Sequence, residues 1–204
     1  MEMGAACMLE NIKTGKIMKI RWNACYAASN ILKKKWLEKN YNWKVDLLEC
    51  LLETVRNFQN FKVRINAAVA LDSAASRGTV GDFYLPMLEG LVESLSSTHS
   101  EEVFGEWQHQ ENLRDQLSLS LCQIVALCKD EKEFSKVCSV VGDSWDLVET
   151  SLNHSIKRIS PEKSSPFLAA SQTAEQLAGG KLAGKEEVMM LCKLLWELSM
   201  AWAG

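Results

Sequence analysis

The stretch Phe61 to Leu71, FKVRINAAVAL, decides the fold, because the segment Met18 to Ala28, MKIRWNACYAA, is a second copy of it. Arg21 and Arg64 mark the offset, which is 43 residues. Across this offset a basic residue, a β-branched residue, an arginine, an asparagine and two alanines recur in register. A period of about 40 to 47 residues is typical of HEAT and armadillo repeats, which are built from short helices. The sequence therefore predicts an all-α fold, a right-handed α-solenoid of about three to four helix pairs with capping helices at its C-terminal end.

The same two copies carry a resemblance to a known family. The run KIRWNACYA from Lys19, followed by NFKVRINAA from Asn60, resembles the C-terminal region of the HEAT repeat-containing protein six family. The similarity covers residues 16–127, and a looser third copy lies at Arg114 to Leu127. This resemblance implies an α-solenoid that serves as a binding scaffold without a known catalytic motif.

Apolar residues at helical spacing divide the chain into units. We expect a repeat domain over residues 1–158, with helix pairs at 1–35, 45–77, 84–128 and 133–158, followed by a linker and capping helices over 159–204. The first pair is expected to begin in mid-repeat, because Leu9 aligns with Leu52 of the next copy. Since such an edge lacks its neighbour, we expect it to expose apolar side chains and to self-associate.

The helical period also predicts which side chains face the core. Val45 is expected to face inward at the start of its helix. Residues 96–110 are expected to form a long acidic connection in which Phe104 and Trp107 are available as anchors, and the alternative is that both residues pin this segment to the core. The inward residues expected on the second helices are Ile20, Ala24, Ala27, Ala28, Ile31, Val63, Ala67, Ala70, Leu71, Ala74, Leu113, Leu117, Ser120, Leu121 and Ile124.

Composition excludes several classes of protein. Hydrophobic residues make up 47% of the 204 residues, which argues against disorder throughout the chain. The seven cysteines form no C-x-x-C pair and lie mostly in apolar helical patterns, so we interpret them as reduced core residues. No segment resembles a secretory signal or a membrane span, and we expect a cytoplasmic or nuclear protein.

Neither catalysis nor a cofactor is expected. Residues 179–185, GGKLAGK, have the spacing of a phosphate-binding loop, but Glu186 stands where a serine or threonine must contact magnesium. The three histidines are scattered and have no cysteine or second histidine at a metal-ligand spacing. No G-x-S-x-G pentapeptide is present. The sequence therefore predicts a protein that is not an enzyme and that uses no metal ion or cofactor.

Charge is divided unevenly along the chain. The net charge is −3, yet residues 1–77 carry 13 Lys and Arg against 7 acidic residues. An acidic overall balance argues against a general nucleic-acid binder. A nucleic-acid-associated solenoid stays open as an alternative, because residues 33–44 interleave five lysines with three aromatic residues. The other interpretation of this segment is an exposed turn in which Trp36 and Trp43 pack on the flanking helices.

The outward stripe of the second helices predicts a binding surface. The stripe repeats across the offset of 43 and, at the third copy, across an offset of 50. A carboxamide recurs at its middle position as Asn23, Asn66 and Gln116, and a carboxamide can both donate to and accept from an extended peptide backbone. The alternative is that each carboxamide bonds a carbonyl within its own repeat. The candidate groove residues are Lys19, Asn23, Tyr26, Asn30, Lys34, Lys62, Asn66, Ser73, Arg77 and Gln116.

These observations predict a protein-interaction scaffold that uses the concave groove of a solenoid. The partner is expected to be a protein or peptide. The first two copies of the stripe carry a basic residue at each end, which favours an acidic partner. Contact with a membrane is not expected. Besides the nucleic-acid-associated solenoid, a further alternative is a purely architectural segment of a longer array.

Overall fold

The computed structural model describes residues 2–34, 41–74, 76–100, 106–159, 161–163 and 165–178. This part of the chain is helical and contains no β-strand, so the all-α prediction is confirmed for it. The elements are α1 (Glu2–Thr14), α2 (Met18–Leu32), α3 (Asn42–Asn57), α4 (Phe61–Asp72), α5 (Arg77–Val80), η2 (Gly81–Phe83), α6 (Tyr84–Ser100), α7 (Trp107–Ala126), α8 (Glu131–Gly142), α9 (Trp145–Arg158), η3 (Pro161–Lys163) and α10 (Ser165–Ala178).

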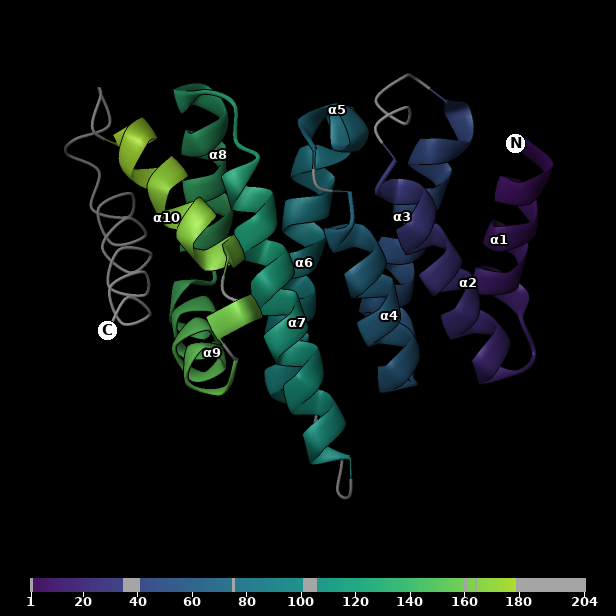
Figure 1. The fold of residues 1–204 in the computed structure, drawn as a ribbon. Coiled ribbons are helices and arrows are strands. Elements are labelled where there is room, and N and C mark those ends of the chain that lie inside the picture. The colour runs from purple at the N-terminus through teal and green to yellow at the C-terminus, as the bar shows by residue number, and fades with distance from the viewer. Residues whose placement is uncertain are drawn as a thin grey trace.

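The helices are arrayed from an end formed by α1 and α2, through α3, α4, α6 and α7, to an end formed by α8, α9 and α10, where α8 lies above α9 in the view (Figure 1). We call α1, α3 and α6 the first layer, because α1 packs on α3 and α3 on α6. We call α2, α4 and α7 the second layer, because α2 packs on α4 and α4 on α7. Each first-layer helix also packs on the second-layer helix that follows it in the chain. The repeat in the sequence is therefore also a repeat in space.

The first two pairs are followed by a third pair and by helices that cover it. α9 packs on both α6 and α7, and α10 packs on α7 and α8. A single apolar core extends through the stack from Ala5 of α1 to Ala174 of α10. Small side chains bring the second-layer helices together: Ser29 Oγ of α2 lies 2.8 Å from Ser73 Oγ, directly after α4, and both residues are buried.

An arginine near the start of each second-layer helix binds the end of the first-layer helix before it. The final carbonyl groups of a helix have no donor within the helix, and these arginines supply one; Thr98 O also accepts from Gln110 Nε2. We call each contact an arginine clamp. The clamps are Arg21 Nη1 to Ile12 O, Arg64 Nε to Val55 O and Arg114 Nη2 to Thr98 O, each at 2.7 Å. The three carbonyl groups lie 43 residues apart in sequence, whereas the arginines lie 43 and 50 apart.

The expected core is confirmed on α4 and α7, where all the residues predicted to face inward are buried. It is wrong at Ile20 of α2 and Val45 of α3, each of which is 42% exposed. In α2 the buried face includes Cys25 and Ser29 as well as alanine. Ala24 and Ala28 of that face were predicted correctly, whereas Ile20 lies in the first turn of α2, which stands at the surface.

The long connection predicted at residues 96–110 is wrong. α6 continues to Ser100 and α7 begins at Trp107, so most of the segment is helical. Serine and threonine favour turns in sequence because their hydroxyl groups compete for backbone partners. Here these groups bond within the helix, as Ser96 Oγ does to Val92 O and Thr98 Oγ1 to Leu95 O. Trp107 is 64% exposed, so its side chain does not anchor this segment to the core.

Several expectations lie outside the described residues. These are the packing of Trp36, the role of Phe104, the phosphate-loop spacing at residues 179–185 and the part of the expected capping region that follows residue 178. Among the helices that the structure describes, none combines the length and the apolar character needed to cross a lipid bilayer.

Candidate functional site

A groove of about 500 Å³ lies on the second layer, where three successive helix pairs meet. We call it the second-layer groove. Its walls come from the N-terminal portions of α2, α4 and α7, three helices that follow one another across the layer. The lining residues are Trp22, Asn23 and Tyr26 of α2, Lys62, Ile65 and Asn66 of α4, and His109 and Asn112 of α7.

The polar side chains of this groove are suited to binding. Asn66 Nδ2 donates to Lys62 O in its own helix at 2.7 Å, which is the arrangement that the alternative interpretation of the carboxamides expected. Asn23 and Asn112 are exposed, and neither side chain bonds another residue within the described ranges. Their carboxamides therefore face the groove with both donor and acceptor groups available.

Apolar side chains give the groove a surface on which a partner can bury its own. Tyr26 is 63% exposed, while Trp22 and Ile65 are partly buried. Trp22 and Ile65 occupy equivalent positions across the offset of 43 residues. An aromatic ring with a polar end that stands in solvent is a frequent feature of protein-binding surfaces.

Four of the ten predicted residues, Asn23, Tyr26, Lys62 and Asn66, line this groove. Lys19, Asn30 and Lys34 are exposed on or beside α2 but are not among its lining residues.

Gln116, the predicted counterpart of Asn23 and Asn66 on the third copy, does not line the second-layer groove. Its Nε2 atom lies 3.5 Å from Asp72 Oδ2 and 3.3 Å from Ser120 Oγ, between α4 and α7. Burial raises the pKa of the Asp72 carboxyl to about 6, and the Gln116 hydrogen bond acts in the opposite direction. Gln116 therefore serves the packing of two second-layer helices.

Ser73 and Arg77 likewise face other parts of the protein. Ser73 is 8% exposed, and its hydroxyl donates to Val69 O at 2.8 Å as well as contacting Ser29. Arg77 Nη2 lies 2.8 Å from Glu133 Oε1 of α8, and its guanidinium stacks 4.7 Å from the centre of the Tyr84 ring. Both residues were assigned to the groove because the stripe was continued past the end of α4, where the chain changes direction into α5.

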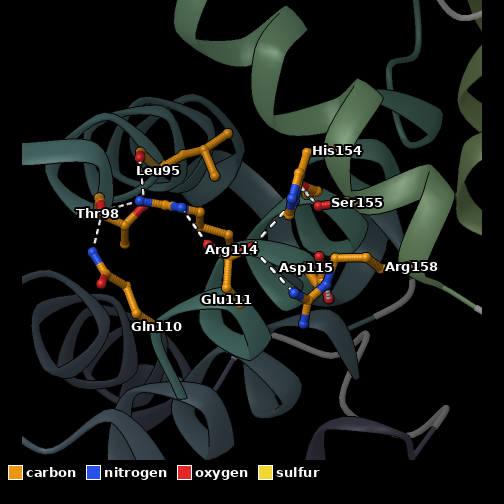
Figure 2. Close-up of polar contacts among 10 residues, drawn as sticks. Leu95, Thr98, Gln110, Glu111, Arg114, Asp115, His154, Ser155 and Arg158 are labelled. Atoms are coloured by element: carbon orange, nitrogen blue, oxygen red, sulfur yellow. Dashed lines mark hydrogen bonds and ion pairs between the residues drawn. The ribbon is translucent and has the colours of Figure 1, made fainter. Parts of the chain in front are cut away.

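Figure 2 shows the cluster of charged residues between α7 and α9. Glu111 Oε2 lies 3.2 Å from both His154 Nδ1 and Arg158 Nη1, and Glu111 also pairs with Arg114. Arg158 Nε lies 3.1 Å from Asp115 Oδ2. Since each carboxylate has a basic partner, this cluster joins two helices. Within the described residues, no group of histidine, cysteine and carboxylate side chains is arranged to hold a metal ion.

The first layer carries grooves of the opposite charge. One of about 560 Å³ lies between α1 and α3, and one of about 300 Å³ lies between α3 and α6. Glu49 and Glu53 of α3 line both. The other carboxylates on these two grooves are Asp46, Glu89 and Glu93.

Sequence reasoning missed Trp22, Ile65, His109 and Asn112. Trp22 and Ile65 could have been found, because they adjoin Asn23 and Asn66 and recur at the same offset. His109 was missed because residues 96–110 were interpreted as a connection, which hid the first turn of α7. Asn112 follows from the outward stripe, since it lies 50 residues after Lys62, but it was left out of the candidate groove residues.

Comparison with known proteins yields little beyond this geometry. No family model matches the chain, and no solved structure matches it. An uncharacterized protein of Dictyostelium discoideum is 31% identical over 127 residues, which cover 56% of this chain and 8% of that protein. The chain therefore spans a small fraction of the length of the relative that it matches.

Proposed function

We propose that this chain is a non-catalytic protein-binding scaffold, an α-solenoid of HEAT-like helix pairs that holds a partner in the second-layer groove. Three kinds of observation support the solenoid: the sequence repeat, the two layers, and the arginine clamp at equivalent positions of three pairs. In arrays of this kind each repeat contacts mainly its neighbours and the stack presents an extended binding surface.

The observation that carries the binding role is the composition of the groove. Exposed Tyr26 lies beside Asn23 and Asn112, whose carboxamides have no partner among the described residues. A surface that combines an exposed aromatic ring with free donors and acceptors matches the composition of protein interfaces. Contributions from three helix pairs make the surface long enough for a chain segment.

A nucleic-acid partner has weaker support. Of the lysines in residues 33–44, Lys44 is only 3% exposed and donates to Gly78 O at 3.2 Å, so its ammonium group faces the protein. The carboxylates on the first layer would repel a phosphate backbone. An architectural segment without a ligand is the remaining alternative, and the length of the Dictyostelium relative is compatible with it.

Site-specific photocrosslinking tests the proposal. A p-benzoylphenylalanine at Tyr26 replaces one aromatic side chain by another, and the same group at Glu89 on the first layer is the matched control. We expect protein adducts in cells from position 26 and few from position 89. RNA adducts at position 26 would favour the nucleic-acid alternative, and equal adducts at the two positions would refute the groove.

A salt titration on the captured partner separates the same alternatives by their physics. Affinity for nucleic acid falls steeply with salt because counterions are released, whereas a peptide held by apolar contacts loses little affinity.

A further inference from the structure

We propose that the second-layer groove takes an acidic peptide segment that inserts one large apolar side chain beside Tyr26. This inference rests on the protein-binding function proposed above and specifies the chemistry of the partner. It follows from the charges that line the groove, from the charges that are kept out of it, and from its apolar wall.

The ionisable groups that can attract a charged partner are basic in this groove. Lys62 of α4 and His109 of α7 line it, and no carboxylate is among its lining residues in the described part of the chain. The first turns of α2 and α4 also carry no acidic residue. A concave surface with one sign of charge raises the local concentration of partners with the opposite sign.

The nearest carboxylates of α7 are neutralised on another side of the helix. Glu111 and Asp115 point toward His154 and Arg158 of α9, and Glu111 also pairs with Arg114 of α7 itself (Figure 2). These carboxylates therefore do not offset the charge of Lys62. The basic character of the groove is preserved even though α7 itself contains acidic residues.

The opposite layer carries the other sign. Carboxylates outnumber basic side chains in both first-layer grooves, although Lys13 and Arg21 line the groove between α1 and α3, and Arg56 pairs with Glu93 in the other. An acidic segment is repelled there and attracted at the second layer. The charge of the partner thus selects the face that it binds, which is a matter of specificity more than of affinity.

The apolar side chains of the groove indicate that the partner also contributes an apolar residue. Trp22, Tyr26 and Ile65 come from two adjacent helices, and Tyr26 is 63% exposed. The groove of about 500 Å³ is open to solvent, so an incoming side chain can lie against this apolar wall. We therefore infer one leucine, methionine or aromatic residue within the acidic segment, because its burial supplies the affinity that exposed charges do not.

Selection from a random library of phage-displayed peptides on the full chain tests this inference. The expected peptides are rich in Asp and Glu around one large apolar residue, and the best of them is labelled with fluorescein for anisotropy measurements. Lys62→Glu should weaken its binding by about tenfold or more. Lys136→Glu, the same change at an exposed position of α8, is the matched control and should alter binding by less than about twofold.

A replacement of the apolar residue of that peptide by serine should also cost about tenfold. The inference is overturned if the selection yields basic peptides, neutral peptides or none, if single-stranded RNA competes at equal concentration, or if Lys62→Glu and Lys136→Glu behave alike. Photocrosslinks to protein at Tyr26 together with any of these results would leave the scaffold function standing and reject only the acidic partner. Failure of the photocrosslinks themselves would reject the proposed function.

Discussion

Gly90 of α6 lies so close to Leu52 of α3 that a Cβ atom on Gly90 would stand 2.7 Å from Leu52 Cδ2. Both residues are buried, and α6 can approach α3 this closely because Gly90 has no side chain. Gly90→Ala should therefore lower the free energy of unfolding by about 1 to 3 kcal/mol, despite the higher helix propensity of alanine. Urea denaturation followed by circular dichroism measures the change.

Gly4→Ala is the matched control, because Gly4 lies in α1 and a Cβ there would meet no atom within 4 Å. It should stabilise the chain by as much as about 1 kcal/mol. Combining Gly90→Ala with Leu52→Ala should recover part of the loss caused by overpacking. Additive costs in the double variant would contradict this account of the contact.

Arg64→Met should destabilise the protein by about 3 kcal/mol, because Arg64 is 2% exposed and its Nε donates to Val55 O at the end of α3. The substitution keeps much of the side-chain volume but leaves a helix end without its donor. Arg56→Met is the control: its ion pair with Glu93 is exposed, and its loss should cost less than about 1 kcal/mol. Equal decreases in melting temperature for the two variants would show that the arginine clamp stabilises the fold no more than an exposed ion pair does.

Ala67→Asp should rank among the most destabilising substitutions, at about 3 kcal/mol or more. Ala67 is fully buried, so a carboxylate there would be both desolvated and overpacked. Ala6→Asp, at an exposed position of α1, should leave the melting temperature nearly unchanged. Retention of the wild-type melting temperature by Ala67→Asp would refute the buried assignment.

Stability should depend on pH through Asp72. The pKa of this carboxyl is raised to about 6 in the folded chain, whereas an unfolded aspartate titrates near about 3.9. Between these values the folded chain holds a proton that the unfolded chain has lost, so the contribution of Asp72 to stability falls as pH rises from about 4 to about 6. At neutral pH the charged form is disfavoured by about 2 to 3 kcal/mol.

Asp72→Asn should therefore raise the free energy of unfolding at pH near 7 and flatten its decline between about pH 4 and 6. Urea midpoints of the variant and the parent across this range supply the measurement. Asp46→Asn, at an exposed position of α3, should leave that decline in place. A parallel pH profile for the Asp72 variant would show that burial does not control this carboxyl.

The double change Asn23→Ala with Asn66→Ala should leave the fold intact while weakening capture of the partner photocrosslinked at position 26. Among the described residues, these two side chains make one hydrogen bond, from Asn66 to its own helix, and such a surface bond contributes little to stability. Gln116→Ala should lower stability and leave capture of the partner unchanged, since Gln116 bonds the largely buried Asp72 and does not line the groove. Full capture by the folded double variant would deny the carboxamides a binding role.

Much of the fold could be predicted from the sequence, because the repeated segments combine helical period with register across the offset of 43. Ala67, Ala70 and Leu71 were placed correctly since both signals agree there. Ile20 was misplaced because the first turn of α2 stands at the surface, which an apolar pattern within one helix does not reveal.

The groove was predicted only in part, for a reason that lies in tertiary structure. Tyr26 and Lys62 followed from the stripe, but Ser73 and Gln116 depend on contacts with Ser29 and Asp72 that no single helix reveals. A periodic pattern identifies the face of a helix that turns away from the core. It does not indicate whether a neighbouring helix then covers that face.

The arginine spacing and the carbonyl spacing differ at the third helix pair, which shows how one pair can depart from the repeat and keep the same contact. Arg114 follows Arg64 by 50 residues, yet its carbonyl partner Thr98 follows Val55 by the ordinary 43, so the third helix pair tolerates an insertion without losing its clamp. Part of the insertion lengthens α7 by about one turn before the arginine, and His109 enters the groove from that turn. Insertion at this junction is a route by which evolution can alter recognition while the helix packing stays as it was.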